Sequence, residues 1–339
     1  MFRIVCACLQ IVLLFGLPTV SHAAEPLPLE AYFRPQNAVK LPDGRRFNIF
    51  CIGSGGPTAL IDSSLSQWSL EWRDIQRDLA QVTRVCTFDR AGYGFSDPGP
   101  LPRDASAEVG NLENALKAAA IKPPYILVGH SLGGINMRLF AYKHTEDVAG
   151  ILLVDPAIEH GDKRLPYPKS YHDENLSFYR GCLKQLEAGP LTPGFILPGA
   201  EDPCLPKRPH DLSKAVWSKL TEIYFSKSRF EVMLSETESK DETSSNDLDA
   251  NRHSLGSIPL VILSSDKAHF TEDRPNGVDA DTLYNAWISA HEDQARNSTQ
   301  GKNVIVEGAS HFIFEERPDA LLDAFNEVVQ QARASKMKP

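Results

Sequence analysis

Short apolar runs alternate along most of the chain with longer stretches whose apolar positions recur every three to four residues. The short runs are rich in Val, Ile and Leu, which is typical of buried strands, and the longer stretches have the period of helices with one buried face. Strict alternation of strand and helix predicts a parallel sheet with helices on both faces. The predicted strands span residues 46–52, 58–62, 84–88, 125–128, 149–154, 258–263 and 303–307, with a hairpin formed by 37–41 and 46–52, and the predicted helices span 73–80, 105–120, 135–142, 281–295 and 318–334.

The alternation breaks between residues 158 and 256, where Pro, Lys, Tyr and charged residues become more frequent. Helical pieces such as 212–225 indicate a cap inserted between a first core part, 24–157, and a second core part, 257–339. The very polar run at 235–246 is interpreted as a solvated helix and loop rather than a site. Candidates for lining a pocket under the cap are Tyr167, Tyr171, Tyr179, Trp217, Tyr224 and Phe225.

The sharpest signal is Gly129-His-Ser131-Leu-Gly133, which lies between the predicted strand at 125–128 and the helix at 135–142. A strand, a Gly-x-Ser-x-Gly turn and a helix form a nucleophile elbow, in which the serine hydroxyl stands above the sheet. The flanking glycines let strand and helix pass closely. The N–H of Leu132 then points to where an oxyanion would form. We therefore predict that Ser131 is a nucleophile.

A serine hydroxyl needs a base, and the base needs a carboxylate to orient it. Among ten histidines, His311 is the one that directly follows a buried strand and precedes the last helix. His130 is expected to point away from Ser131 and to pack. For the acid, Asp155 and Asp266 both follow predicted strands and both keep the order Ser, Asp, His. Both remain candidates at this stage.

The N-terminal residues 1–23 have a short positive end, an apolar core and small residues before a cleavage point. This pattern is typical of a signal peptide and predicts an exported protein, periplasmic or secreted, without a membrane span after signal removal. Once Cys6 and Cys8 leave with the signal, four cysteines remain in an oxidising compartment, and their even number suggests two disulfides. For Cys51 and Cys86, buried thiols are an equal alternative. Cys182 and Cys204 lie 22 residues apart in the predicted cap and are the first pair.

Three motifs together resemble those of the α/β-hydrolase superfamily, and they extend the resemblance over nearly all of the mature chain. They are Gly129-His-Ser-Leu-Gly-Gly134, Asp89-Arg-Ala-Gly-Tyr-Gly-Phe-Ser96 and Glu307-Gly-Ala-Ser-His-Phe312, and they resemble most closely bacterial esterase-like members with a helical cap. The resemblance implies an α/β fold with a mostly parallel eight-stranded sheet whose second strand is antiparallel and lies beside the fourth.

The resemblance also carries residue roles. The second and fourth strands hold Cys51 and Cys86, so the resemblance implies that these two cysteines are neighbours. Ser63-Ser64 stands where the family commonly has His-Gly, which makes the N–H of Leu65 the second oxyanion donor by position. Asp155 sits where some relatives carry their acid, so it is favoured over Asp266.

The sequence therefore predicts a serine hydrolase that cleaves a small-molecule carboxylic ester through an acyl-enzyme and needs no cofactor. A serine at the elbow argues against the dehalogenase and epoxide-hydrolase branches, which use Asp there. Aminopeptidase, thioesterase, lactonase and perhydrolase chemistry stay open, as does a non-catalytic binding protein on this fold. A net charge of −9 argues against nucleic acid as a partner, and no cysteine or histidine spacing resembles a zinc site.

Overall fold

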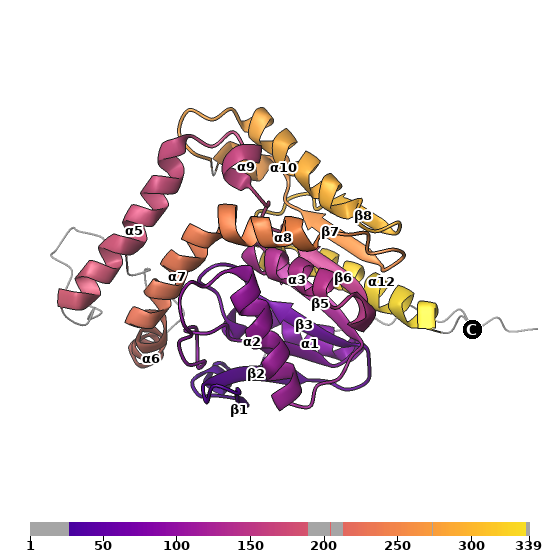
Figure 1. The fold of residues 1–339 in the computed structure, drawn as a ribbon, viewed down its shortest axis with the longest axis horizontal. Coiled ribbons are helices and arrows are strands. Elements are labelled where there is room, and N and C mark those ends of the chain that lie inside the picture. Colours follow the sequence, from indigo (N-terminus) through magenta and orange to yellow (C-terminus); the bar gives the residue numbers. More distant parts are fainter. Residues whose placement is uncertain (1–26, 189–203, 205–212, 273, 337–339) are drawn as a thin grey trace, which may run out of the picture.

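A computed structural model describes residues 27–188, 204, 213–272 and 274–336 of the 339-residue chain. The predicted signal peptide, residues 1–23, lies outside them. The described residues form an eight-stranded sheet in the order β1-β2-β4-β3-β5-β6-β7-β8 (Figure 1). The strands are β1 (Ala38–Lys40), β2 (Arg46–Ile52), β3 (Thr58–Asp62), β4 (Val85–Phe88), β5 (Tyr125–His130), β6 (Val148–Val154), β7 (Leu260–Ser264) and β8 (Gly301–Ile305).

Strand β2 runs antiparallel to both of its neighbours, β1 and β4, and the pairs from β4 to β8 are parallel. This order, with the second strand beside the fourth, is the one that the resemblance implies, and it confirms the predicted fold. Cys51 lies directly opposite Cys86 in the β2–β4 register, and the two form a disulfide.

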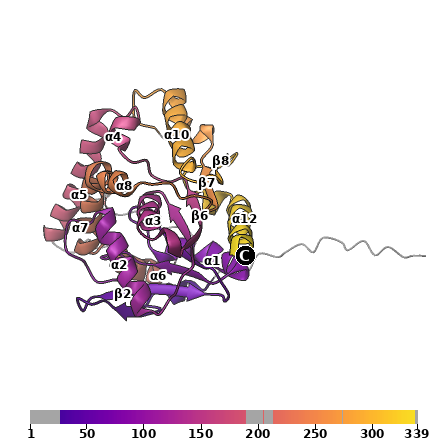
Figure 2. The same cartoon turned by 45° about the vertical axis from the view of Figure 1, so that its right-hand side comes forward.

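Helices cover both faces of the sheet (Figures 1 and 2). Successive residues of a strand point to opposite faces, so Leu60 and Leu127 pack with α2 and α3, whereas Ile61 and Val128 pack with α1 and α12. The helices with their bounds are α1 (Arg73–Val82), α2 (Ala105–Ala118), α3 (Leu132–Lys143), α4 (Gly161–Arg164), α5 (Lys169–Ala188), α6 (Lys214–Tyr224), α7 (Lys227–Ser239), α8 (Ser245–Asn251), α9 (Lys267–Glu272), α10 (Ala280–Ala295), α11 (Ile313–Glu316) and α12 (Pro318–Lys336), with shorter turns η1 (Leu29–Tyr32), η2 (Ser69–Trp72), η3 (Thr145–Asp147) and η4 (Lys240–Ser244).

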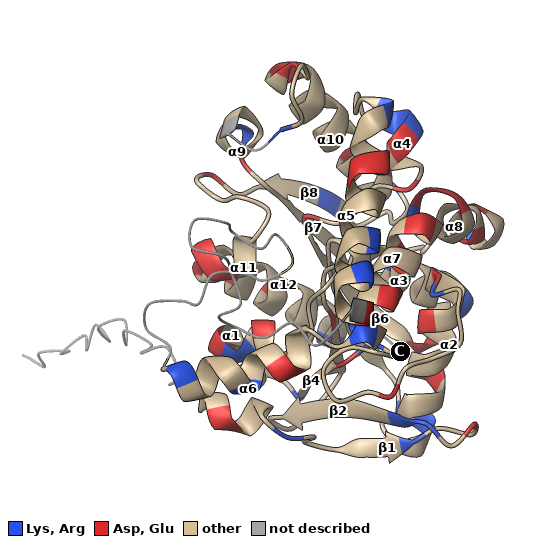
Figure 3. Cartoon of the chain, turned by 90° about the vertical axis from the view of Figure 1, so that its left-hand side faces the viewer, with Lys and Arg blue, Asp and Glu red and all other residues tan. Residues whose placement is uncertain are grey.

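Helices α4 to α8 lie between β6 and β7, within the stretch where the alternation of the sequence breaks. Positive and negative residues are interspersed along α5 and α6 (Figure 3). Arg180 on α5 pairs with Glu238 on α7 at 2.7 Å, and Cys182 on α5 forms a disulfide with Cys204. The boundaries of this segment as a cap, 158–256, remain a prediction.

The polar run at 235–246 is more buried than its composition suggests. It contains the end of α7, the π turn η4 and the start of α8, and its Ser235, Glu236 and Ser244 are all nearly inaccessible. The Ser235 hydroxyl accepts a hydrogen bond from the N–H of Arg103, and the Ser244 hydroxyl accepts one from the N–H of Ala105. The interpretation as a solvated helix and loop is therefore wrong, because these side chains bind backbone and side-chain groups of the core.

Candidate active site

The turn that carries Ser131 is strained and tightly packed. Ser131 has φ of 50° and ψ of −117°, between the end of β5 and the start of α3. A Cβ on Gly129 would lie 2.7 Å from the carbonyl oxygen of Gly133, so a side chain cannot be accommodated there. The N–H of Ser131 donates to the carbonyl of Val154 at 3.1 Å, and its carbonyl accepts from Ala157 at 2.8 Å. The surroundings thus hold a conformation that a non-glycine residue rarely adopts.

The ring of His311 is held by a carboxylate. Its Nδ1 lies 2.6 Å from Oδ2 of Asp155, which is the first residue after β6. His311 itself follows β8 and leads into α11. Because Nδ1 faces the carboxylate, Nε2 is free to accept a proton, which is the arrangement that a general base requires.

Asp155 is 1% exposed, and several donors satisfy its other oxygen. Oδ1 accepts hydrogen bonds from the Ser265 N–H at 3.0 Å, the Ser265 hydroxyl at 3.1 Å and the Trp287 indole N–H at 2.9 Å. Burial alone would raise the pKa of this carboxyl, but the hydrogen bond and charge of His311 bring it well below its ordinary value. This pKa shift favours the ionised form of Asp155 beside the ring of His311.

Asp266, the other candidate acid, binds backbone instead. Its Oδ2 accepts a hydrogen bond from the N–H of Gly308 at 2.7 Å, and its own N–H donates to the carbonyl of Ala309 at 2.8 Å. Those contacts tie the end of β7 to the loop that leads to His311. The backbone hydrogen bond from Gly308 lowers the pKa of this carboxyl below its ordinary value.

His130 does more than pack. Its Nε2 lies 2.9 Å from the carbonyl oxygen of His311, which can only accept, so the ring proton sits on Nε2. Its Nδ1, which then carries no proton, lies 3.1 Å from Oε1 of Gln67, and that oxygen accepts a hydrogen bond from the N–H of Ser64 at 3.3 Å. Burial and, to a lesser extent, the nearby His311 together lower the pKa of His130 to about 3, so the ring is neutral. The ring of His130 is thus bound to the loop of His311 and contacts the loop after β3.

Ser131 and His311 line one cavity of about 320 Å³ together with Leu65 and Leu132. Within the described residues, the N–H groups of Leu65 and Leu132 donate no hydrogen bond to other protein groups. Two uncommitted N–H groups beside a strained serine are what a developing oxyanion needs. The geometry can therefore support attack by a hydroxyl on an acyl carbon.

Three of the six aromatic candidates, Tyr167, Tyr171 and Tyr179, line this cavity, with Trp287. A second cavity of about 570 Å³ shares Tyr167, Tyr171, Trp287 and His311 with the first. Tyr224 and Phe225 pack instead in an aromatic cluster with Trp68. The sequence missed Trp287, since one indole on a long helix has no pattern that marks it as a partner for a carboxylate.

In the described part of the chain, no group of three or more His, Cys, Asp or Glu side chains is arranged to hold a metal ion. None of the described helices combines the length and apolarity that crossing a bilayer requires.

Known proteins share sequence with this chain at the level of a family and of several individual relatives. Residues 53–324 match the model of the alpha/beta hydrolase family. The uncharacterized protein YqjL of Bacillus subtilis is 38% identical over 106 residues, which are 31% of this chain and 42% of that protein. An AB hydrolase superfamily protein of Gibberella zeae is 33% identical over 103 residues, 29% of this chain and 32% of that protein. The matches thus span less than half the length of these relatives.

Solved structures share the fold at low identity. A thermophilic esterase from Thermogutta terrifontis has a TM-score of 0.59 and 18% identity, over 87% of this chain and 98% of that one. The epoxide hydrolase CorEH has a TM-score of 0.60 and 18% identity, over 86% of this chain and 97% of that one. Two different chemistries on one fold mean that the site residues must decide the reaction.

Proposed function

Since the chain belongs to the alpha/beta hydrolase family, we propose that it is an exported serine hydrolase that cleaves carboxylic esters. The observation that carries the proposal is the strained Ser131 in one cavity with His311, whose ring binds the buried Asp155 at 2.6 Å. Attack by Ser131, with His311 moving its proton, would account for the positions of all three residues, which supports the proposal.

In the proposed reaction, Oγ of Ser131 bonds to the acyl carbon while Nε2 of His311 takes the hydroxyl proton. The oxyanion receives hydrogen bonds from the N–H groups of Leu132 and Leu65. The imidazolium, which Asp155 stabilises, returns the proton to the leaving alkoxide as the C–O bond breaks. Water then adds to the acyl-enzyme by the same route and releases the acid.

A serine at the elbow favours acyl transfer, since its ester intermediate is hydrolysed by the same base that formed it. Among acyl donors, we propose esters because an alkoxide leaves more readily than an amine. The aromatic residues Tyr167, Tyr171 and Trp287 give the cavity a partly apolar wall that suits an acyl group.

Export is proposed on two grounds. The sequence pattern of residues 1–23 is that of a signal peptide, and disulfides such as Cys51–Cys86 and Cys182–Cys204 persist in oxidising compartments. The N-terminal mass of the protein recovered from the periplasm or medium tests this, and a chain that keeps Met1 and stays in the cytoplasm contradicts it.

The activity is tested with p-nitrophenyl esters from C2 to C12, using wild type and Ser131→Ala. We expect turnover by wild type and its loss in Ser131→Ala. A fluorophosphonate probe adds a second readout. Labelling of Ser131 without ester turnover would keep the serine chemistry but exclude simple esters, and the absence of both would favour a binding protein on this fold.

A further inference from the structure

The loop of residues Ser63–Gln67, here called the oxyanion loop, contributes Leu65 to the lining of the cavity that contains Ser131, and the N–H of Leu65 is the proposed second oxyanion donor. This N–H belongs to the same peptide unit as the carbonyl of Ser64. A trans peptide unit is planar, and its C=O and N–H point in opposite directions. Whatever binds the Ser64 carbonyl therefore also aims the Leu65 N–H.

Arg90, in the loop after β4, binds that carbonyl. Its Nη2 donates to Ser64 O at 2.9 Å, and its Nη1 donates to Ser63 O at 2.7 Å. The remaining donors reach Asp62 Oδ1 at 2.6 Å and Glu236 at 2.8 and 3.3 Å. All five guanidinium N–H groups are thus engaged, and Arg90 is only 1% exposed. A planar fork so engaged cannot turn without breaking several hydrogen bonds.

Tyr93 holds the peptide on the other side of Leu65. Its hydroxyl accepts a hydrogen bond from the N–H of Ser66 at 3.3 Å and donates one to Oε2 of Glu236 at 2.6 Å. Both peptide units that flank Leu65 are therefore connected, through Arg90 and through Tyr93, to the same carboxylate.

That carboxylate comes from the segment between β6 and β7. Glu236 lies on α7, is 3% exposed and lines the cavity that contains Ser131 and His311. Figure 1 shows α7 between α5 and the core helices α2 and α3. The oxyanion loop thus depends on a helix that follows it by about 170 positions in the sequence.

We propose that Glu236 is a positioning residue that aims the Leu65 N–H at the oxyanion by fixing Arg90 and Tyr93. The effect of Glu236 on catalysis rests on the proposed ester hydrolysis, whereas its effect on the order of the oxyanion loop does not. Glu236, Arg90 and Tyr93 are here called the clamp. Related enzymes have His-Gly where this chain has Ser63-Ser64, so the loop lacks their glycine, and the clamp orients the Leu65 N–H instead. The second oxyanion donor is then in place only when α7 is seated against the core.

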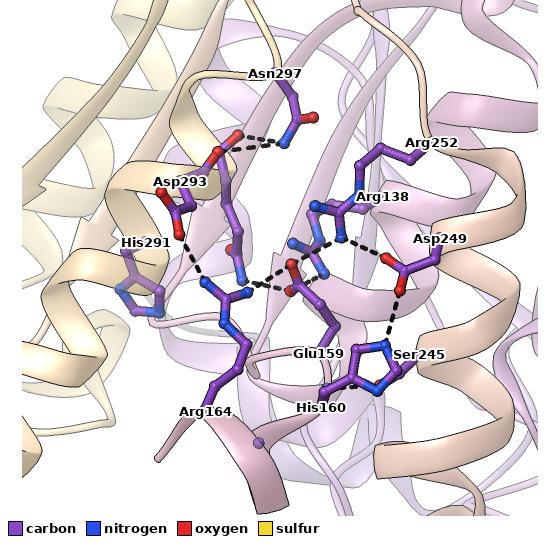
Figure 4. A network of polar contacts seen from close by, with 12 residues as sticks. Arg138, Glu159, His160, Arg164, Ser245, Asp249, Arg252, His291, Asp293 and Asn297 are labelled. Atoms are coloured by element: carbon purple, nitrogen blue, oxygen red, sulfur yellow. Dashed lines mark hydrogen bonds and ion pairs between the residues drawn. The ribbon is translucent and has the colours of Figure 1, made fainter.

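The test uses Glu236→Gln, which keeps the shape but removes the charge, and Tyr93→Phe, which removes one hydroxyl. Glu159→Gln is the matched control. Glu159 is 1% exposed and binds Arg138, Arg164 and Arg252 (Figure 4). It too joins α3 to the segment that carries α4 and α8, and none of these three partners belongs to the oxyanion loop.

Two readouts are combined. Hydrogen–deuterium exchange of peptides that cover Ser63–Gln67 reports loop order whether or not esters are turned over. We expect faster exchange there in Glu236→Gln and Tyr93→Phe, and no change in Glu159→Gln. In ester hydrolysis we expect kcat to fall about 10- to 100-fold with KM within about 2-fold, since removing an oxyanion donor outright costs about 10²–10³. The Ki of a trifluoromethyl ketone should rise by the same factor.

Hydrogen–deuterium exchange of the oxyanion loop that is unchanged in Glu236→Gln and Tyr93→Phe would overturn the proposed role of Glu236. An equal increase of that exchange in Glu159→Gln would overturn it too. Faster exchange with unchanged kcat would overturn its catalytic role. If wild type hydrolyses no ester and binds no trifluoromethyl ketone, the proposed function fails, and exchange alone then decides whether Glu236 orders the loop. If Glu236→Gln does not fold, Tyr93→Phe carries the same comparison.

Discussion

Nδ1 of His311 lies 2.6 Å from Oδ2 of Asp155, although β7 separates the two strands that these residues follow. The loop after β6 must therefore reach across the end of β7. It does so because Asp155 adopts φ of 39° and its N–H donates to the carbonyl of Leu263 at 2.7 Å. Asp266 lies nearer in strand order, yet its carboxylate binds the N–H of Gly308.

Asp155→Asn should lower kcat by about 10⁴, because an amide at this position favours the wrong tautomer of the histidine and cannot stabilise an imidazolium. The effect is measured as kcat on the preferred p-nitrophenyl ester.

Asp266→Asn is the control for that experiment. It removes one charge from the same edge of the sheet without touching the ring of His311, so kcat should stay within about 3-fold of wild type. Equal losses in the two variants, or a larger loss in Asp266→Asn, would reverse the assignment.

Much of the fold could be predicted from the sequence because buried parallel strands such as Leu260–Ser264 read as continuous apolar runs between turns. The first and last residues of the strands were less predictable. The last strand is Gly301–Ile305 rather than 303–307, since its exposed edge leaves Val304 and Ile305 half in solvent and weakens the pattern. The serine motif needs only local sequence, because the strand, turn and helix around Ser131 are contiguous.

Other parts of the site depend on contacts between distant segments. Glu236 lies in a polar run whose composition favours solvent, but it is buried against Arg90 and Tyr93, which lie 146 and 143 positions earlier. Strand alternation predicts only that His130 packs in the core, but its ring also forms a hydrogen bond with the carbonyl of His311, 181 positions away. Pairwise contacts of this kind have no local signature.

Gly133→Ala should destabilise the fold by about 1–3 kcal/mol, the usual range for overpacking. A Cβ on Gly133 would collide with backbone atoms of Asp62 and would lie 2.8 Å from the carbonyl oxygen of Ser63, and backbone cannot move aside as a side chain can. The readout is the urea midpoint of unfolding.

Gly110→Ala is the matched substitution, since Gly110 lies inside α2 and nothing stands within 4 Å of an added Cβ. It should raise stability by about 0.5–1 kcal/mol, because alanine loses less conformational freedom in a helix. A midpoint for Gly133→Ala at or above the wild-type value would contradict the packing argument for the elbow.

The double substitution Cys51→Ala with Cys86→Ala should cost about 3–4 kcal/mol of unfolding free energy. The disulfide closes a loop between residues 35 positions apart, and the chain-entropy relation gives that magnitude for such a loop. The free energy of unfolding is measured with and without dithiothreitol. Wild type should be weakened by the reductant, whereas a wild type indifferent to it would show that the bonds do not form in solution.

The neutral, buried His130 makes stability depend on pH. Its pKa falls from 6.5 in the unfolded chain to about 3 in the folded one, so below pH 6.5 the unfolded state binds a proton that the folded state does not. Stability therefore decreases as pH falls from 6.5 towards 3, by up to about 1.4 kcal/mol per pH unit from this group. His130→Asn lacks the group, so its difference from wild type in unfolding free energy should shrink by about 3 kcal/mol between pH 7 and pH 4. A constant difference for His130→Asn over that range would mean that the ring is accessible to protons in the folded state.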